Sequence, residues 1–350
     1  MTQLLENKLF QKEVASVAQL PVRWEKFQNK SILIAGATGM IGSYLIDVLM
    51  HKNNSGLNCK VIALGRNVEK AQQRFGKYWN REDFMFYAAD INRALPDSVG
   101  GVDYVLHAAS NTHPVAYATE PISTITTNVI GTNNLLRYCA REKVERFVFA
   151  SSVEIYGENR GDCEAFTEDY CGYIDCNTLR AGYPESKRVG EALCQAYIKE
   201  QGLDIVIARL ARIYGPTMLM SDTKALSQFI KKGIRGEDIV LKSAGMQYFS
   251  YCYVADAVYA LLVLLTQGKT GEAYNIADTG SNIRLKDLAG EIAEHVGRKV
   301  IFEIPDAVET AGYSKATTAI LNAEKIRKLG WNAQYDIHAG LCRTLDILSK

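Results

Sequence analysis

The sequence has no excess of charge of either sign and no concentrated basic stretch. Its 40 lysine and arginine residues face 39 aspartate and glutamate residues, which leaves a formal charge of +1. Binding to nucleic acid or to an anionic membrane surface would need a block of basic residues, and the sequence contains none. We therefore expect neither nucleic acid nor a membrane among the partners of this protein.

Long hydrophobic runs are also missing. No stretch reaches the roughly 18 apolar residues that a membrane-spanning helix needs. The apolar segment "VADAVYALLVLLTQG" is too short and carries Asp256. The first residues, "MTQLLENKLFQKEVA", lack the apolar core of a signal peptide. These features predict a cytoplasmic protein.

Cysteine and histidine occur without the spacing of a metal site or a disulfide framework. The eight cysteines match neither a C-x-x-C pair nor a secreted pattern. The five histidines are dispersed, with no carboxylate or thiol at ligand spacing. We expect reduced thiols, most of them buried, and no metal site.

Apolar residues make up 47% of the 350 residues, enough for a large core. Short β-branched runs alternate with longer amphipathic segments, a pattern typical of a parallel sheet covered on both faces. The sequence therefore predicts an α/β fold with a doubly wound parallel (Rossmann) sheet. The expected strands lie within residues 31–39, 60–65, 84–90, 102–110, 146–152 and 204–210.

The domain organisation predicted from this pattern is interleaved. Residues 1–29 form a polar N-terminal arm, and residues 30–215 form a dinucleotide-binding domain that residues 250–268 complete. Beyond Gly215 the alternation loosens, with amphipathic helices in "TKALSQFIKKGIRGE" and "RLKDLAGEIAEHVG" and a strand in "KVIFEIP". Residues 216–249 and 269–350 are thus expected to form a smaller C-terminal α/β substrate cap.

A glycine-rich turn, "GATGMIG", follows the first expected strand and opens a helix. Gly36, Gly39 and Gly42 would let the backbone turn tightly and approach a pyrophosphate. The turn predicts a cofactor site, to which Thr38, Met40 and Ile41 also belong. The alternative is a structural turn without a ligand.

The second expected strand ends in "ALGRN", which bears on the choice of cofactor. An acidic residue about twenty positions beyond the glycine turn favours NAD, whereas a basic residue can meet the 2′-phosphate of NADP. Arg66 stands there without an adjacent acid, so NADP(H) is favoured over NAD(H). The alternative is a solvated arginine that stacks on adenine.

Tyr183 and Lys187 stand four residues apart in "AGYPESKR", at the start of an expected helix, so both project from one face. A lysine ammonium beside the phenol would favour the phenolate, whose ordinary pKa is about 10. Ser152 lies upstream at the carboxyl end of a strand, where ligands of such sheets bind. The three residues predict acid–base chemistry.

With these motifs the chain resembles the extended short-chain dehydrogenase/reductase family of nucleotide-sugar epimerases, dehydratases and decarboxylases. The resemblance rests on the glycine turn, "AADI", "HAAS", "TNVIGTNNLL", "SSVEIYG", "YPESK", "RIYGP", "YVADAV" and "LNAEKIRKLGW". It implies that Tyr183 is the acid/base, that Lys187 holds the nicotinamide ribose and that Ser152 bonds the reacting oxygen. The further cofactor residues that it implies are Asp90, at the adenine, and Ile91, Ala108, Ala109 and Asn128.

The local likeness is greatest to UDP-glucuronate decarboxylases, followed by dTDP-glucose 4,6-dehydratases. In these subgroups a glutamate two residues past the catalytic Ser or Thr works next to the keto carbon, which implies that role for Glu154. If the strand continues, Ser152 and Glu154 face the same pocket. The alternative is that Glu154 caps a turn or pairs with a base.

The resemblance also implies substrate contacts and an assembly. Arg180 matches an arginine of the decarboxylase subgroup, although a solvated arginine at a helix entrance is equally consistent with the pattern. His113 is expected within reach of substrate, whereas His107 is expected to pack. The amphipathic helices around residues 128–140 and 185–200 would pair in a homodimer.

Two positions depart from the family pattern. Phe249, in "MQYFSYCYVAD", stands where the family usually carries an arginine for the substrate phosphates or the reacting centre. Arg212, in "RLARIYGP", stands where an asparagine usually meets the substrate. One cation is lost and another gained, so both are candidate substrate-binding positions, with Arg212 available to grip the pyrophosphate from another strand.

Three functions remain open at this level. The first is NAD(P)-dependent modification of a nucleotide-linked sugar through a keto sugar, with the cofactor recycled. The second is NADPH-dependent reduction of a nucleotide-linked keto sugar or ketose to a reduced sugar or alditol. The third is NADP(H) binding without catalysis, which the presence of Ser152, Tyr183 and Lys187 disfavours.

Overall fold

The computed structural model describes residues 2–112, 114–303 and 317–349. Its centre is a seven-stranded sheet in which every neighbouring pair is parallel, in the order β10-β6-β5-β4-β1-β2-β3. The strands are β1 (Ser31–Ala35), β2 (Lys60–Gly65), β3 (Phe84–Ala88), β4 (Tyr104–His107), β5 (Arg146–Ser152), β6 (Ile205–Leu210) and β10 (Ala273–Ile276). The expected doubly wound α/β sheet is confirmed.

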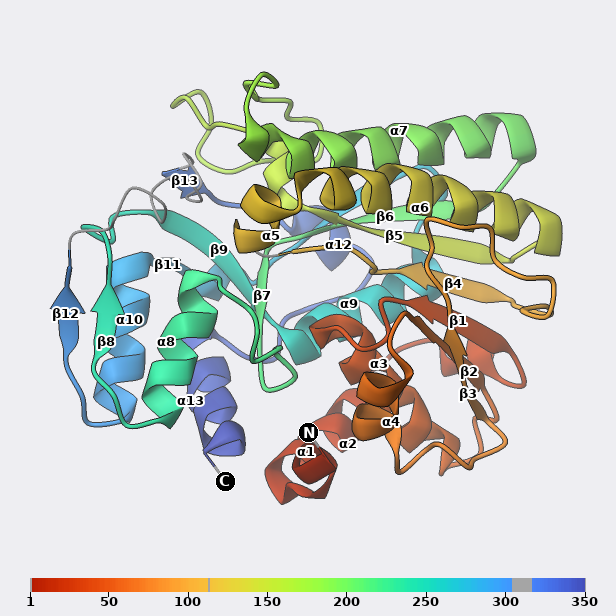
Figure 1. Cartoon of the computed structure of the whole chain (residues 1–350), viewed down its shortest axis with the longest axis horizontal. Coiled ribbons are helices and arrows are strands. Elements are labelled where there is room, and N and C mark those ends of the chain that lie inside the picture. Colours follow the sequence, from red (N-terminus) through yellow and green to blue (C-terminus); the bar gives the residue numbers. More distant parts are fainter. Residues whose placement is uncertain (1, 113, 304–316, 350) are drawn as a thin grey trace.

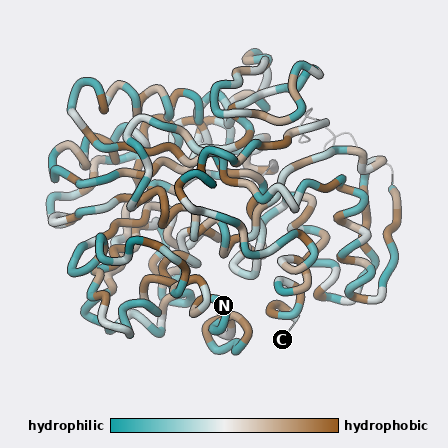
Figure 2. The backbone as a smooth tube through the Cα atoms, turned by 180° about the vertical axis from the view of Figure 1, so that it is seen from behind, coloured by the Kyte–Doolittle hydropathy of each residue, from teal (hydrophilic) through white to brown (hydrophobic). Residues whose placement is uncertain are grey.

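Helices cover both faces of this sheet (Figure 1). One face carries α2 (Lys8–Gln19), α3 (Met40–Asn53), α4 (Val68–Phe75) and α9 (Val254–Gln267), and the other carries α6 (Pro121–Glu142) and α7 (Gly182–Gln201). Successive β1 residues alternate between the two faces: Ile32 and Ile34 join one apolar cluster, Leu33 and Ala35 the other. Both faces are therefore buried, and in Figure 2 the central strands are mostly brown.

A smaller unit lies beside the sheet. It contains the paired strands β8 (Ile239–Leu241) and β12 (Val300–Phe302), with α8 (Ala225–Ile234), α10 (Leu285–His295) and α13 (Ile337–Leu348) packed together. Between the two units, β9 (Tyr248–Tyr253) pairs with β7 (Arg212–Tyr214), β11 (Asn282–Arg284) and β13 (Thr318–Ala319). That this unit binds substrate stays a prediction.

The N-terminal segment is anchored in the core. Phe10 of α2 is buried, and the buried Glu13 accepts hydrogen bonds from the hydroxyls of Tyr44 and Tyr253 and from Nε of Arg343. Burial raises the pKa of Glu13. The carboxylate thus ties α2 to α3, to the end of β9 and to α13.

The remaining elements are short. They are α1 (Thr2–Glu6), α5 (Pro114–Thr119), α12 (Glu324–Arg327) and the 3₁₀ turns η1 (Trp24–Phe27), η2 (Val153–Tyr156), η3 (Leu179–Ala181) and η4 (Thr279–Ser281). Among the described residues, no helix combines the length and the apolar composition needed to cross a membrane. All cysteines are free thiols, but only Cys59, Cys139, Cys194 and Cys252 are buried, so the expectation that most are buried was wrong.

Candidate active site

The glycine turn leaves no room for side chains at two of its positions. Gly36 has a φ of +88°, and a Cβ there would lie 2.6 Å from the carbonyl carbon of Ala108. A Cβ on Gly42 would lie 2.5 Å from the carbonyl oxygen of Gly36, whereas one on Gly39 would meet the same oxygen at 3.2 Å. The N-terminus of α3 follows directly, so this cradle fits a pyrophosphate, and the contact of these residues with one stays a prediction.

The carboxyl ends of the other strands meet the same edge of the sheet. Ala108 and Ala109 follow β4, and Asp90 and Ile91 come shortly after β3. The carboxylate of Asp90 accepts a hydrogen bond from the Asn92 backbone amide. The structure thus gathers the predicted cofactor residues along one edge, and their contacts with a cofactor stay predictions.

Two cations follow β2: Arg66 directly after the strand and Lys70 in the first turn of α4. Arg66 is exposed, and Asn67 caps α4 by accepting a hydrogen bond from the Lys70 backbone amide. Burial and the charge of Arg66 both lower the pKa of Lys70. The two positive charges therefore repel one another, and an anion between them would relieve that repulsion.

Ser152 and Glu154 are close together for a reason that the sequence argument missed. The strand does not continue: β5 ends at Ser152, and Glu154 lies in the 3₁₀ turn η2. Oγ of Ser152 accepts a hydrogen bond from the Glu154 backbone amide at 3.2 Å. The expected strand geometry was therefore wrong, because the hydroxyl of Ser152 caps the turn that carries Glu154.

Glu154 is paired with a base, as the alternative interpretation allowed. Nη2 of Arg180 lies 2.7 Å from Oε1 of Glu154. The Arg180 guanidinium also lies 4.9 Å from the centroid of the Tyr117 ring, and that ring stacks on Tyr183 at 4.6 Å. Ion pair and stacked rings place Glu154, Arg180 and Tyr183 in one cluster.

Tyr183 holds its proton more tightly than an ordinary phenol. Burial and the charge of Glu154 raise its pKa to about 12, against hydrogen bonding to Ser152 and the charge of Arg180, which lower it. That Lys187 makes the phenol more acidic stays a prediction. Nζ of Lys187 donates to the Ala150 carbonyl at 2.8 Å.

Lys187 is buried, and its ammonium lies 4.8 Å from the centroid of the Phe149 ring. Burial lowers its pKa to about 8, while the charge of Glu191 acts to raise it. Nearby, Nδ2 of Asn128 donates to Ser186, and Oδ1 of Asn128 has no partner among the residues described. Such a buried, unpaired acceptor is consistent with a ligand contact at Asn128.

His107 packs as expected. Its ring is buried, with Nε2 2.9 Å from Oγ1 of Thr132, and burial lowers its pKa well below the ordinary value. His113 lies outside the described residues. No group of three or more potential metal ligands occurs in the part of the chain that the structure describes.

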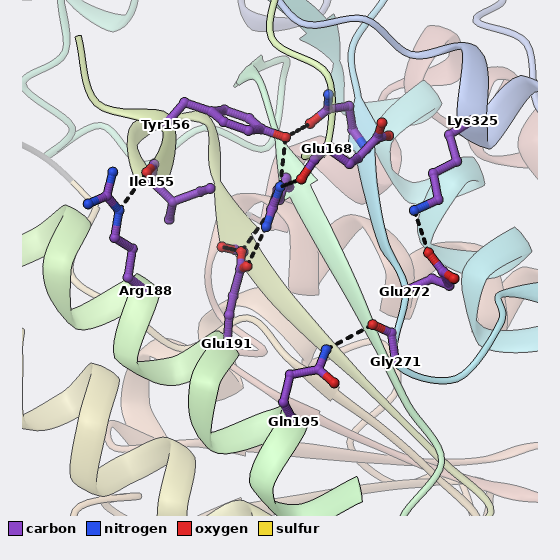
Figure 3. Close-up of polar contacts among 12 residues, drawn as sticks. Ile155, Tyr156, Glu168, Arg188, Glu191, Gln195, Gly271, Glu272 and Lys325 are labelled. Atoms are coloured by element: carbon purple, nitrogen blue, oxygen red, sulfur yellow. Dashed lines mark hydrogen bonds and ion pairs between the residues drawn. The ribbon is translucent and has the colours of Figure 1, made fainter. Parts of the chain in front are cut away.

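Glu191 stands one turn after Lys187 on α7 and belongs to a network of polar contacts. It accepts a hydrogen bond from Ser151 at 2.5 Å and pairs with Arg209 at 2.7 Å. Glu191 and the hydroxyl of Tyr156, both labelled in Figure 3, contact the same guanidinium, that of Arg209. Nη1 of Arg209 donates to the Tyr156 hydroxyl at 3.0 Å. This network borders a cavity of about 560 Å³ between α7, β6 and β10, which the candidate catalytic residues do not line.

Three residues of this region were missed from the sequence. Glu191 stands four residues after Lys187 and Lys70 four after Arg66, so helical spacing carried a signal for both. Tyr117 had none, because only the packing of α5 against η3 brings its ring onto Tyr183.

The titration of Lys187 tests the role of Glu191. Because Glu191 favours the ammonium form, Glu191→Gln is expected to lower the pKa of Lys187 below its value of about 8. NMR of ¹³C-labelled lysine, assigned with Lys187→Met, would follow the change. Glu185→Gln on the same helix, which removes a pair with Arg188, is the control and should leave the midpoint unchanged. An equal midpoint in the Glu191→Gln variant would contradict the assignment.

Comparison with known proteins identifies the family. Residues 32–277 match the NAD dependent epimerase/dehydratase family. UDP-glucuronic acid decarboxylase 6 of Arabidopsis thaliana is 31% identical over 326 residues, covering 92% of this chain and 90% of the relative.

Solved structures agree in fold. A dTDP-glucose 4,6-dehydratase from Streptomyces venezuelae, with NAD bound, is 25% identical with a TM-score of 0.79, covering 91% of this chain and 96% of that one. A UDP-glucuronic acid 4-epimerase from Bacillus cereus, in complex with UDP-glucuronic acid and NAD, is 22% identical with a TM-score of 0.78, covering 91% and 98%. The chain belongs to the NAD dependent epimerase/dehydratase family.

Proposed function

We propose that this chain is an NAD(P)-dependent enzyme that modifies a nucleotide-linked sugar through a keto sugar and regenerates its cofactor in each cycle. One observation carries the proposal. Tyr183 lies in one cluster with the Glu154–Arg180 ion pair and is hydrogen-bonded to Ser152, at the same edge of the sheet as the glycine turn. Decarboxylation is the favoured reaction, since two curated relatives that are 31% identical over 92% of this chain are UDP-glucuronic acid decarboxylases.

The residues divide the proton chemistry between them. The nicotinamide cofactor, when bound, accepts and returns a hydride. Ser152 and Tyr183 hydrogen-bond to the sugar oxygen that changes between hydroxyl and carbonyl, and Tyr183 exchanges a proton with it. With a pKa of about 12, the Tyr183 phenol is set up to donate its proton, and neutralising Glu154 would lower that pKa and so favour the phenolate that acts as the base.

Glu154 is suited to a second proton step. Its carboxylate is held by Arg180 at 2.7 Å and faces the same cluster as Tyr183. A carboxylate there is able to take or return a proton on a carbon next to the keto group, and Arg180 would stabilise negative charge developing on that substrate. Tyr183 thus serves proton transfer at the sugar oxygen, and Glu154 serves proton transfer at the neighbouring carbon.

Absorbance at 340 nm tests this function. With NAD(P)⁺ and UDP-glucuronic acid we expect product by mass spectrometry without net accumulation of reduced cofactor. Steady consumption of NADPH with a keto sugar or ketose would instead support the reductase alternative. Tyr183→Phe should lower turnover by roughly 100-fold or more, because the proton donor is lost. Tyr87→Phe, on the outermost strand β3, removes a hydroxyl that donates to the Ser98 carbonyl and is the control. Unchanged activity in Tyr183→Phe would refute this assignment.

We further propose that the cofactor is NADP(H) rather than NAD(H). Support comes from the mutual repulsion of Arg66 and Lys70 at the end of β2, where a 2′-phosphate would sit. The relatives with NAD in their structures leave this preference open.

Fluorescence titration with NADPH and NADH checks the preference. Arg66→Asp is expected to weaken NADPH binding by roughly tenfold or more relative to NADH, because a charge-assisted contact becomes a repulsion. The exposed Arg23, remote from this edge, provides the control variant Arg23→Asp. Tighter NADH than NADPH binding by the unaltered chain would disprove the preference.

We also propose a homodimer formed by α6 and α7. Large apolar side chains are exposed on this layer, with exposed fractions of 77% for Ile122, 45% for Ile130 and 43% for Val189. A hollow of about 320 Å³ between the two helices is lined by Ile125, Val129 and Val189 among others. Burial of these apolar side chains against the same helix pair of a second copy would remove them from water and so favour a dimer.

Light scattering after size exclusion tests the assembly. Val189→Glu is expected to convert the dimer to a monomer, since the charge would be buried without a partner. Val68→Glu alters a side chain of 44% exposure on α4, away from this layer, and should leave the dimer intact. A monomeric unaltered chain would rule the dimer out.

A further inference from the structure

The two residues that depart from the family pattern contact each other. Cζ of Arg212 lies 3.4 Å from the centroid of the Phe249 ring, which is buried. The strands β7 and β9 pair with Arg212 opposite Tyr251, and Phe249 lies on the same face as Tyr251, two residues away. A guanidinium over an aromatic ring is held by cation–π attraction. Arg212 and Phe249 therefore form one unit, in which the ring on β9 supports a cation that originates on β7.

This unit lies near the cluster formed by Glu154, Arg180 and Tyr183. Burial lowers the pKa of Arg212, and the charges of Glu154 and Arg180 act on it in opposite directions, the first raising and the second lowering that pKa. Tyr117, which stacks on Tyr183, also acts on it. The guanidinium of Arg212 is thus close enough to the reacting end of the cluster to be influenced by its charges.

The cluster has more positive charge than negative. Arg180 already neutralises Glu154 at 2.7 Å, and Arg212 adds a second cation. Nη1 of Arg212 and Nε of Arg180 are both buried, and neither has a hydrogen-bond partner among the residues described. A buried N–H without an acceptor is unfavourable, so two unused donors on two arginines favour binding of an anion.

We propose that Arg212, supported by Phe249, binds a carboxylate on the reacting sugar, with Arg180 as the second donor. A carboxylate has two acceptor oxygens and can bond to both arginines. The inference rests on the proposed function, because it takes the substrate to be a nucleotide-linked sugar. A diphosphate offers the same oxygen chemistry, but the second donor, Arg180, pairs with Glu154 at 2.7 Å in the cluster that contains Tyr183, and this favours the sugar end.

Calorimetry with UDP, UDP-glucose and UDP-glucuronic acid separates the two sources of the anion. We expect the unaltered chain to bind UDP-glucuronic acid more tightly than UDP-glucose. In Arg212→Gln the affinity for UDP-glucuronic acid should fall by roughly tenfold or more, the effect of losing a charge-assisted pair. The affinities for UDP and UDP-glucose should be unchanged.

Two further variants test the unit itself. Phe249→Leu keeps an apolar side chain but removes the ring, so it should weaken UDP-glucuronic acid binding selectively. The double variant Arg212→Asn with Phe249→Arg moves the cation to β9 and should recover part of the affinity that Arg212→Asn alone loses. Arg284→Gln is the matched control, because Arg284 stacks on Tyr248 at 5.6 Å and is exposed. Thermal unfolding would show that each variant is folded.

The outcomes are distinct. Equal weakening of UDP and UDP-glucuronic acid in Arg212→Gln would place the arginine at the diphosphate and overturn the inference. Unchanged binding of all three ligands in that variant would overturn it as well. Failure of the unaltered chain to bind any of them would refute the proposed function, and with it the carboxylate that Arg212 is proposed to receive.

Discussion

The parallel direction of the seven central strands is the constraint on which the site depends. Because all the strands run the same way, their carboxyl ends lie along one edge, and side chains far apart in sequence become neighbours there. On this edge the glycine turn packs closely against the residues that follow β4, where a Cβ on Gly36 would lie 2.6 Å from the carbonyl carbon of Ala108. The same edge carries Ser152 at the end of β5 and the two cations at the end of β2.

Charge balance within the buried cluster then determines what its residues are able to do. Glu154 raises the pKa of Tyr183, and Arg180 opposes that effect. The state of one carboxylate is therefore coupled to the acidity of the phenol beside it. A substrate carboxylate between Arg180 and Arg212 would compete with Glu154 for the arginines, which links substrate binding to proton transfer at Tyr183.

The second layer of polar contacts comes from the opposite side of β5. Glu191 accepts from Ser151 and pairs with Arg209, and its charge favours the protonated form of Lys187. The neighbours Ser151 and Ser152 thus point to different partners, one to Glu191 and the other to the turn that carries Glu154. One strand end therefore contacts both the carboxylate that favours the charged form of Lys187 and the turn that carries Glu154.

Much of this architecture was predictable from the sequence, and each failure has a physical cause. The apolar strands, the glycine turn and the spacing of Tyr183 and Lys187 report local geometry, so the fold class and the helix carrying both residues were predicted correctly. The path of the chain after Ser152 was not, because a hydroxyl cap converts an apparent strand into a turn. Helix spacing placed Lys187 beside Tyr183 on one helix, but it did not predict that burial and Glu154 raise the pKa of Tyr183.

The sequence by itself determined the fold class, through its periodicity and turn chemistry, and it indicated the family through the resemblance of its motifs. Only the tertiary structure decided which groups touch. Arg212 and Phe249 are two departures from the family pattern that lie far apart in the sequence. The pairing of β7 with β9 brings the guanidinium to 3.4 Å from the ring centroid. Charge coupling and desolvation depend on such distances between distant segments, and a linear pattern does not contain them.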